Sequence, residues 1–91
     1  DGAVASEHLQ ERRRETHRAI ARRIKRGVRE GDLARGTDAE SLATFVTTLL
    51  NGLSIQARDG VSRGALNAAV DHAMRAWDAN APRDTRGRMA R

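Results

Sequence analysis

Hydrophobic and polar positions alternate with helical periodicity in three segments, which are separated by breaks that contain glycine. The first segment covers about residues 6–30, and Gly31 follows it as a stop signal. On a wheel of about 100° per residue, one side of this segment is apolar: Leu9, Ile20, Ile24 and Val28. The pattern predicts a long first helix that packs along one face only.

The second segment covers about residues 38–59 and ends at Gly60, and it has no charged residue between positions 41 and 57. Thr37 is the predicted N-cap, with Glu40 three residues on completing a capping box. One broad face is apolar: Leu42, Phe45, Val46, Leu49, Leu50 and Leu53. The opposite face is small and mostly neutral: Thr44, Thr47, Thr48, Asn51, Gly52 and Ile55. A face in contact with water normally carries Lys, Glu or Arg, so this helix is expected to be covered on both sides.

The third segment covers about residues 63–79 and shows the same two-sided character. Ser62 is its predicted N-cap, Val61 and Leu66 have the spacing of a hydrophobic staple, and Pro82 follows its end. The large apolar face holds Leu66, Val70, Ala73, Met74 and Trp77. The second face is built from small residues: Ala65, Ala68, Ala69, His72, Ala76 and Ala79. An ordinary alanine-rich helix is the simpler alternative, since alanine is the best helix former.

The expected fold is all-α, with three helices of which the last two form an antiparallel hairpin. Two adjacent helices with two packed faces each predict a four-helix bundle across a two-fold axis of a homodimer. The predicted dimer interface comprises Thr48, Asn51, Gly52, Ile55, Ala65, Ala69, His72, Ala73 and Ala76.

Size and composition support association, because a chain of 91 residues buries little surface alone and this one has no cysteine as a staple. We expect one domain over residues 1–79 and a disordered basic tail over 80–91. Residues 1–6 lack the basic start and apolar core of a signal peptide, which suggests a cytoplasmic protein. The uncharged run is short for a membrane span and contains Asn51 and Gln56, so no membrane partner is expected.

Candidate chemistry is sparse. The three histidines at positions 8, 17 and 72 lie in no metal-ligand spacing, and the glycines match no phosphate-binding loop. Ser41, Ser54 and Ser62 are better explained as helix and cap residues than as nucleophiles. We therefore expect no catalytic residues, no metal and no cofactor, and a protein that is not an enzyme.

The first helix also carries a basic arc: Arg14, Arg18, Arg22, Lys25, Arg26 and Arg29. Such an arc could follow the phosphates of a nucleic acid. Three glutamates, at positions 7, 11 and 15, share it at ion-pairing distance along the helix, and no aromatic residue is available for base stacking. A solvated charged face is the favoured interpretation.

Arg13 and His17 project toward the apolar side of the first helix, one turn apart. A buried guanidinium needs an acceptor, which a ligand carboxylate or phenolate could supply. The favoured alternative is that Arg13 lies beyond the end of the core or bonds a carbonyl of a neighbouring helix.

Three stretches of the sequence resemble the C-terminal half of regulators in the tetracycline-repressor (TetR) family: residues 27–34, 36–39 and, most specifically, 52–60. The pattern of Leu66, Val70, Met74 and Trp77 also fits the helix that closes that domain. The resemblance covers about residues 6–79.

The resemblance implies a transcriptional repressor domain that dimerises through its last two long helices and binds a small, often apolar or aromatic effector. Operator DNA would be bound by an N-terminal helix-turn-helix that this chain lacks. The effector pocket of the family normally draws on helices that precede residue 1, and here Phe45 and Leu49, opposite Arg13 and His17, are the candidate effector-binding residues. Two other functions remain open: an arginine-rich helical nucleic-acid-binding module, and a helical adaptor without a ligand.

Overall fold

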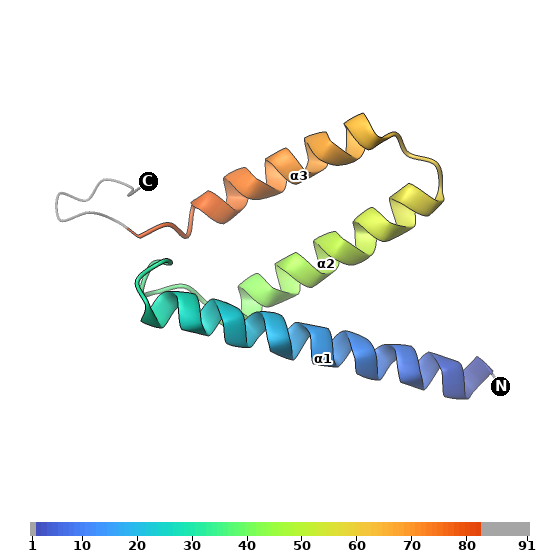
Figure 1. The fold of residues 1–91 in the computed structure, drawn as a ribbon, viewed down its shortest axis with the longest axis horizontal. Coiled ribbons are helices and arrows are strands. Elements are labelled where there is room, and N and C mark those ends of the chain that lie inside the picture. Colours follow the sequence, from blue (N-terminus) through green and yellow to red (C-terminus); the bar gives the residue numbers. More distant parts are fainter. Residues whose placement is uncertain (1, 83–91) are drawn as a thin grey trace.

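The computed structural model describes the backbone of residues 2–82 and the side chains of residues 6–82. Three α-helices follow one another along the chain (Figure 1). They are α1 (Gly2–Arg29), α2 (Ala39–Arg58) and α3 (Arg63–Asp78). No strand occurs within the described range, so the prediction of an all-α fold with three helices is confirmed. The first helix begins at Gly2, ahead of its predicted start near Ser6.

Glycines end the first two helices, as the sequence predicts. Gly31 has φ +85° and Gly60 has φ +89°, a left-handed conformation that side chains with a Cβ rarely adopt. At the end of α2, the Gly60 N–H donates to the carbonyl of Ala57 (3.1 Å) and the Val61 N–H donates to that of Gln56 (3.0 Å). This pattern is the Schellman motif, and it satisfies carbonyls that the end of the helix would otherwise leave unpaired.

The N-cap of α2 is one residue later than predicted. Asp38, with extended backbone, accepts a hydrogen bond from the Ser41 N–H, so the prediction of a cap at Thr37 with Glu40 as its capping-box partner is wrong. A carboxylate at this position also interacts favourably with the positive end of the helix dipole. The cap of α3 is confirmed, since the Ser62 hydroxyl accepts from the Ala65 N–H at 3.1 Å.

The hydrophobic core is small and lies at one end of the molecule. It joins the second half of α1, the connection after it and the first turns of α2: Ala21, Ile24, Leu33, Ala39, Leu42 and Ala43. Ile20, Val28 and Trp77 pack against this cluster. Ala43 is 0% exposed, and its lack of a long side chain allows α1 and α2 to approach closely. Leu9, on the same predicted apolar side of α1, is 54% exposed because α1 and α2 diverge away from the core (Figure 1).

The helices form a layer in which α2 lies between its two neighbours. Viewed down the shortest dimension of the chain, which measures 14 Å, α1, α2 and α3 appear side by side (Figure 1). The packing of α1 on α2 is the more extensive, while α3 touches α2 sparsely and makes no helix packing with α1 in the described range. Domains generally bury their helices between at least two layers.

Much of the predicted apolar face of α2 is therefore not buried within one chain. Of its six residues only Leu42 is buried, while Phe45 is 36% and Leu50 47% exposed. In α3 only Ala73 is buried, and Met74 is 50% exposed.

A backbone hydrogen bond joins the connection between α1 and α2 to the residues that follow α3. The Ala34 N–H, in the connection between α1 and α2, donates to the carbonyl of Asn80 just after α3 (2.8 Å). Residues 80–82, the start of the predicted disordered tail, thus belong to the described chain. The rest of that tail, residues 83–91, lies outside the described residues. None of the described helices has the length and apolar character needed to cross a membrane.

Candidate binding groove and exposed helix faces

The four candidate effector residues fall into different places. Arg13 and His17 of α1 line a groove that they share with Thr47 and Asn51 of α2. Leu49 lines a separate groove between α2 and α3. Residues two apart on a helix point about 200° away from each other, so Thr47 and Leu49 must face opposite neighbours. The structure therefore brings Arg13 and His17 together, but not with Leu49.

Phe45 lines neither groove and is 36% exposed. Phe45 is two residues before Thr47, so about 200° separates the two side chains around the helix axis, and Phe45 points away from α1. The helical wheel predicts Thr47 and Asn51 on the face opposite the core, and it does not identify Gln10 as a groove residue. The signal that could have found this side of α2 is the spacing of Glu40, Thr47 and Asn51, which recur at whole helical turns.

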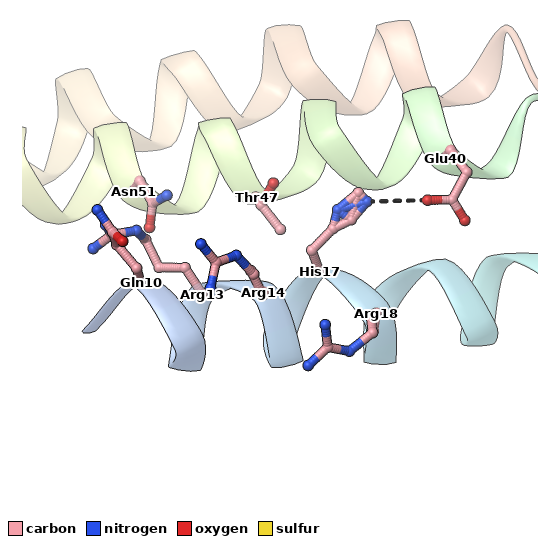
Figure 2. A pocket seen from close by; sticks show the side chains of 8 residues that line it. All are labelled: Gln10, Arg13, Arg14, His17, Arg18, Glu40, Thr47 and Asn51. Carbon is pink, nitrogen blue, oxygen red and sulfur yellow. Dashed lines mark ion pairs between the residues drawn. The ribbon is translucent and has the colours of Figure 1, made fainter. Parts of the chain in front are cut away.

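The groove between α1 and α2 has two parts that share three lining residues. The first is open, has a volume of about 540 Å³, and is lined by Gln10, Arg13, Arg14, His17, Arg18, Glu40, Thr47 and Asn51 (Figure 2). The second encloses about 350 Å³, and its lining includes Leu9 and Leu50. Arg13, Thr47 and Asn51 line both parts and mark their junction.

Two of the arginines on this groove are already paired along α1. Glu11 accepts from Arg18 at 3.0 Å and from Arg14 at 3.2 Å. These hydrogen bonds, the one from Arg18 first, lower the pKa of the Glu11 carboxyl below its ordinary value. Arg12 and Arg13 make no ion pair or hydrogen bond with any side chain of residues 6–82, and Arg13 is the one of the two that lines both parts of the groove.

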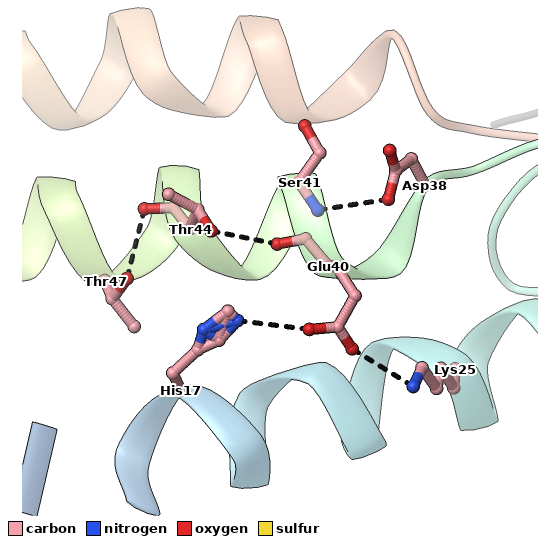
Figure 3. A network of polar contacts seen from close by, with 7 residues as sticks. All are labelled: His17, Lys25, Asp38, Glu40, Ser41, Thr44 and Thr47. Carbon is pink, nitrogen blue, oxygen red and sulfur yellow. Dashed lines mark hydrogen bonds and ion pairs between the residues drawn. The ribbon is translucent and has the colours of Figure 1, made fainter. Parts of the chain in front are cut away.

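A polar network closes the groove toward the core (Figure 3). Glu40 at the start of α2 reaches α1, where Oε1 lies 3.4 Å from His17 Nε2 and Oε2 lies 3.1 Å from Lys25 Nζ. His17 Nε2 is buried, and at 3.4 Å its alignment with Glu40 does not satisfy hydrogen-bond geometry, so the contact is an ion-pair distance only. The pair of Lys25 with Glu40 is exposed, and such pairs contribute up to about 1 kcal/mol.

Three hydroxyl groups of α2 donate hydrogen bonds within the helix. Thr44 donates to the carbonyl of Glu40 and Thr47 to that of Thr44, both at 3.1 Å (Figure 3), and Ser54 donates to that of Leu50 at 3.0 Å. A hydroxyl that already donates within its helix leaves no unpaired donor when the face is covered. An uncharged polar face of this kind is compatible with burial against another helix.

The second candidate site is the pair of faces presented by α2 and α3. A groove of about 380 Å³ runs between them and is mostly apolar, lined by Thr48, Leu49, Gly52, Leu53, Gln56, Val61, Ala65, Leu66 and Ala69. Four of the nine predicted dimer residues line it: Thr48, Gly52, Ala65 and Ala69.

The other predicted dimer residues are distributed differently. Ile55 is 55% exposed, Ala76 and His72 are exposed, and the His72 Nδ1 lies 2.7 Å from Arg75 Nη2. Ala73 is buried within the chain, and Asn51 lines the grooves toward α1.

Four of the six cations in the basic arc of α1 pair with three carboxylates, while Arg22 and Arg29 make no ion pair with residues 6–82. Arg14 and Arg18 pair with Glu11, Arg26 with Glu30 at 2.9 Å, and Lys25 with Glu40. A surface that attracts nucleic acid needs several cations free to contact phosphates. These pairings disfavour the nucleic-acid module. Among the described residues no group of three or more His, Cys, Asp or Glu side chains could hold a metal ion.

Comparison with known families gives a match over most of the chain. The family model described as "BetI-type transcriptional repressor, C-terminal" matches residues 3–88 of the chain. This is a C-terminal domain of the TetR family, to which the sequence bears a resemblance. No curated protein and no solved structure matches the chain significantly.

Proposed function

Because the chain belongs to the family of BetI-type transcriptional repressor C-terminal domains, we propose that it is the dimerisation and effector-binding domain of a TetR-like repressor. The family is a transcriptional regulator domain and not an enzyme. Effector binding, self-association and the partners are the proposed part.

The observation that carries the proposal is the amount of apolar surface that one chain leaves uncovered on α2 and α3. Ile55 is 55% and Met74 50% exposed, and no large side chain is fully buried among the described residues. Exposed apolar patches of this extent mark interaction surfaces.

A second copy of the chain is the proposed partner for this surface. In the proposed dimer, α2 and α3 form an antiparallel hairpin and stack on the same hairpin of the other subunit as a four-helix bundle. The groove between α2 and α3 supports this arrangement, because Gly52, Ala65 and Ala69 allow another helix to approach closely. The Ser54 hydroxyl already donates within α2, which lowers the cost of covering it.

The groove between α1 and α2 is the proposed effector site, with Arg13 and His17 as binding residues. Phe45 and Leu49 stay outside this groove, so we no longer assign them to it. An effector bound here would contact α1 and α2 together and could change the angle between them. Operator DNA would be bound through an N-terminal helix-turn-helix that is not part of this sequence, and the protein would act in the cytoplasm.

The test is the oligomeric state. Multi-angle light scattering at micromolar concentration should give twice the mass of one chain. A monomer at that concentration would contradict the dimer. Hydrogen exchange then locates the interface: amides in the middle of α2 and α3 should exchange more slowly as the protein concentration rises, while those of the N-terminal half of α1 should not.

A further inference from the structure

Arg13 lines both parts of the groove between α1 and α2. Gln10, Arg14 and Arg18 line the first part (Figure 2), and the second part is lined by Leu9 and Leu50 together with Arg12. Leu9 and Leu50 are about half exposed, so they offer apolar surface to a bound molecule. A ligand that spans both parts needs a polar head and an apolar body.

The charges around the groove determine whether the polar head of a ligand is anionic or cationic. Four arginines line its two parts, at positions 12, 13, 14 and 18. Two carboxylates oppose them: Glu11, which holds Arg14 and Arg18, and Glu40, which lies beside His17 and Lys25. The excess is positive: Arg12 and Arg13 are not paired with a carboxylate of residues 6–82, and Arg13 lines both parts of the groove. A cationic head would be repelled there, whereas an anionic head would find a guanidinium able to donate two parallel hydrogen bonds.

The other polar groups at the junction favour the same chemistry. Asn51 has an amide that can donate, and no hydrogen bond to another side chain of residues 6–82 occupies it. The Thr47 hydroxyl already donates its proton to the carbonyl of Thr44, so toward a ligand it can only accept. Arg13 and Asn51 both carry groups that can donate to a ligand at this place in the groove, and a carboxylate can accept from both.

We propose that the groove between α1 and α2 binds an amphipathic organic anion: a monocarboxylate whose head is held by Arg13 and Asn51 and whose apolar body lies on Leu9 and Leu50. The inference rests on the proposed effector-binding function and names the chemical class of the effector. Arg13 sets the sign of charge that is accepted, and the two leucines set the preference for an apolar body.

The test is isothermal titration calorimetry with three probes that share an eight-carbon chain and differ in the head: octanoate, octan-1-ol and octyltrimethylammonium. Each is titrated into the unaltered chain and into Arg13→Gln, Arg13→Lys and Arg22→Gln. Arg22 is the matched control, since it is exposed on the same helix and lines neither part of the groove. Light scattering on the same samples records whether each variant is still a dimer.

The expected result is that octanoate binds, that Arg13→Gln weakens it by about tenfold or more, and that Arg22→Gln leaves it unchanged. Arg13→Lys should lose less than Arg13→Gln, because it keeps the charge without the bidentate geometry. Equal binding of the alcohol, tighter binding of the ammonium probe, or unchanged octanoate affinity in Arg13→Gln would overturn the assignment of an anion while leaving an effector site in place.

Two further outcomes separate this inference from the proposed function. A dimeric protein that binds none of the three probes overturns the inference and leaves self-association intact. A monomeric protein that binds octanoate through Arg13 supports the inference and contradicts the proposed dimer.

Discussion

The Asp38 carboxylate accepts a hydrogen bond from the backbone N–H of Ser41, with 3.1 Å between Oδ1 and N. This contact fixes the first turn of α2 and leaves the neighbouring Glu40 free to reach across to α1. Asp38 and Glu40 thus have different roles at the start of α2. Asp38 starts the helix, and Glu40 joins it to His17 and Lys25.

The cap can be tested with a pair of adjacent substitutions. Asp38→Ala should lower the free energy of unfolding by about 1 kcal/mol, because α2 loses its N-cap acceptor. Thr37→Val should be neutral or slightly stabilising, since the Thr37 hydroxyl oxygen is buried without a hydrogen-bond partner. Urea unfolding at one fixed protein concentration measures both. Equal losses in the two variants, or a greater loss at Thr37, would show that the cap is assigned to the wrong residue.

The turn between α2 and α3 depends on the left-handed backbone of Gly60. Gly60→Ala should cost about 1 kcal/mol, because φ +89° strains a residue with a Cβ. Gly64→Ala is the matched control within the first turn of α3, where an added Cβ meets nothing within 4 Å. It should stabilise the protein by up to about 1 kcal/mol, since alanine is the better helix former. Thermal unfolding of the two variants side by side gives the comparison, and a stabilising Gly60→Ala would refute the argument.

Self-association should fail when a charge is placed on the faces of α2 and α3 that the second copy is proposed to cover. Ile55→Asp and Ala69→Glu each put an unpaired carboxylate there and should weaken the dimer by about 3 kcal/mol, or roughly a hundredfold in dissociation constant. Asn67→Glu is the control, because it adds the same charge to the polar arc of α3. Sedimentation or light scattering over a dilution series reports the constants. Unchanged assembly in both interface variants would remove these residues from the interface.

Low pH should destabilise the N-terminal half of α1, because the Glu11 carboxylate becomes protonated. Its pKa is lowered from the ordinary value of 4.5 by the hydrogen bonds from Arg18 and Arg14. A lowered pKa in the folded state means that the carboxylate stabilises the fold above about pH 4.5. This contribution disappears as the pH falls through the lowered pKa, because the carboxyl is then protonated in the folded state as well.

Carbon-13 NMR titration of the side-chain carboxyl measures this pKa directly. In parallel, Glu11→Gln should be less stable than the unaltered chain at neutral pH, and the difference should vanish in acid. Glu15→Gln is the control, since Glu15 makes no ion pair within the described part of the chain. A Glu11 pKa at or above 4.5 would contradict the contacts with Arg18 and Arg14.

Much of the fold could be predicted because its signals are local. Gly31 and Gly60 end helices through their own backbone conformation, and Ser62 caps α3 through a hydrogen bond three residues away. The same local reasoning was wrong at Thr37 because two adjacent residues can each cap, and the geometry of the connection from Leu33 decides between them. Propensity does not contain that geometry.

The candidate sites were harder to predict, as α2 illustrates. Its helical wheel separates an apolar from a small polar face, but Thr47 and Asn51 of the polar face point to Arg13, while Leu49 of the apolar face points to α3. A wheel gives the direction of each side chain around its own axis. It carries no information on which neighbour lies in that direction.

The amino-acid sequence by itself determined the three helices, the glycines that end the first two, the cap at Ser62 and the family, because each depends on residues close together in the chain or on the pattern as a whole. Only the tertiary structure decided that Arg13 faces Asn51, that Glu40 joins His17 to Lys25, and that Ala34 bonds Asn80. These contacts depend on the angles between helices. The angles follow from how closely the backbones approach at Ala43 and from the conformations of the connections between helices.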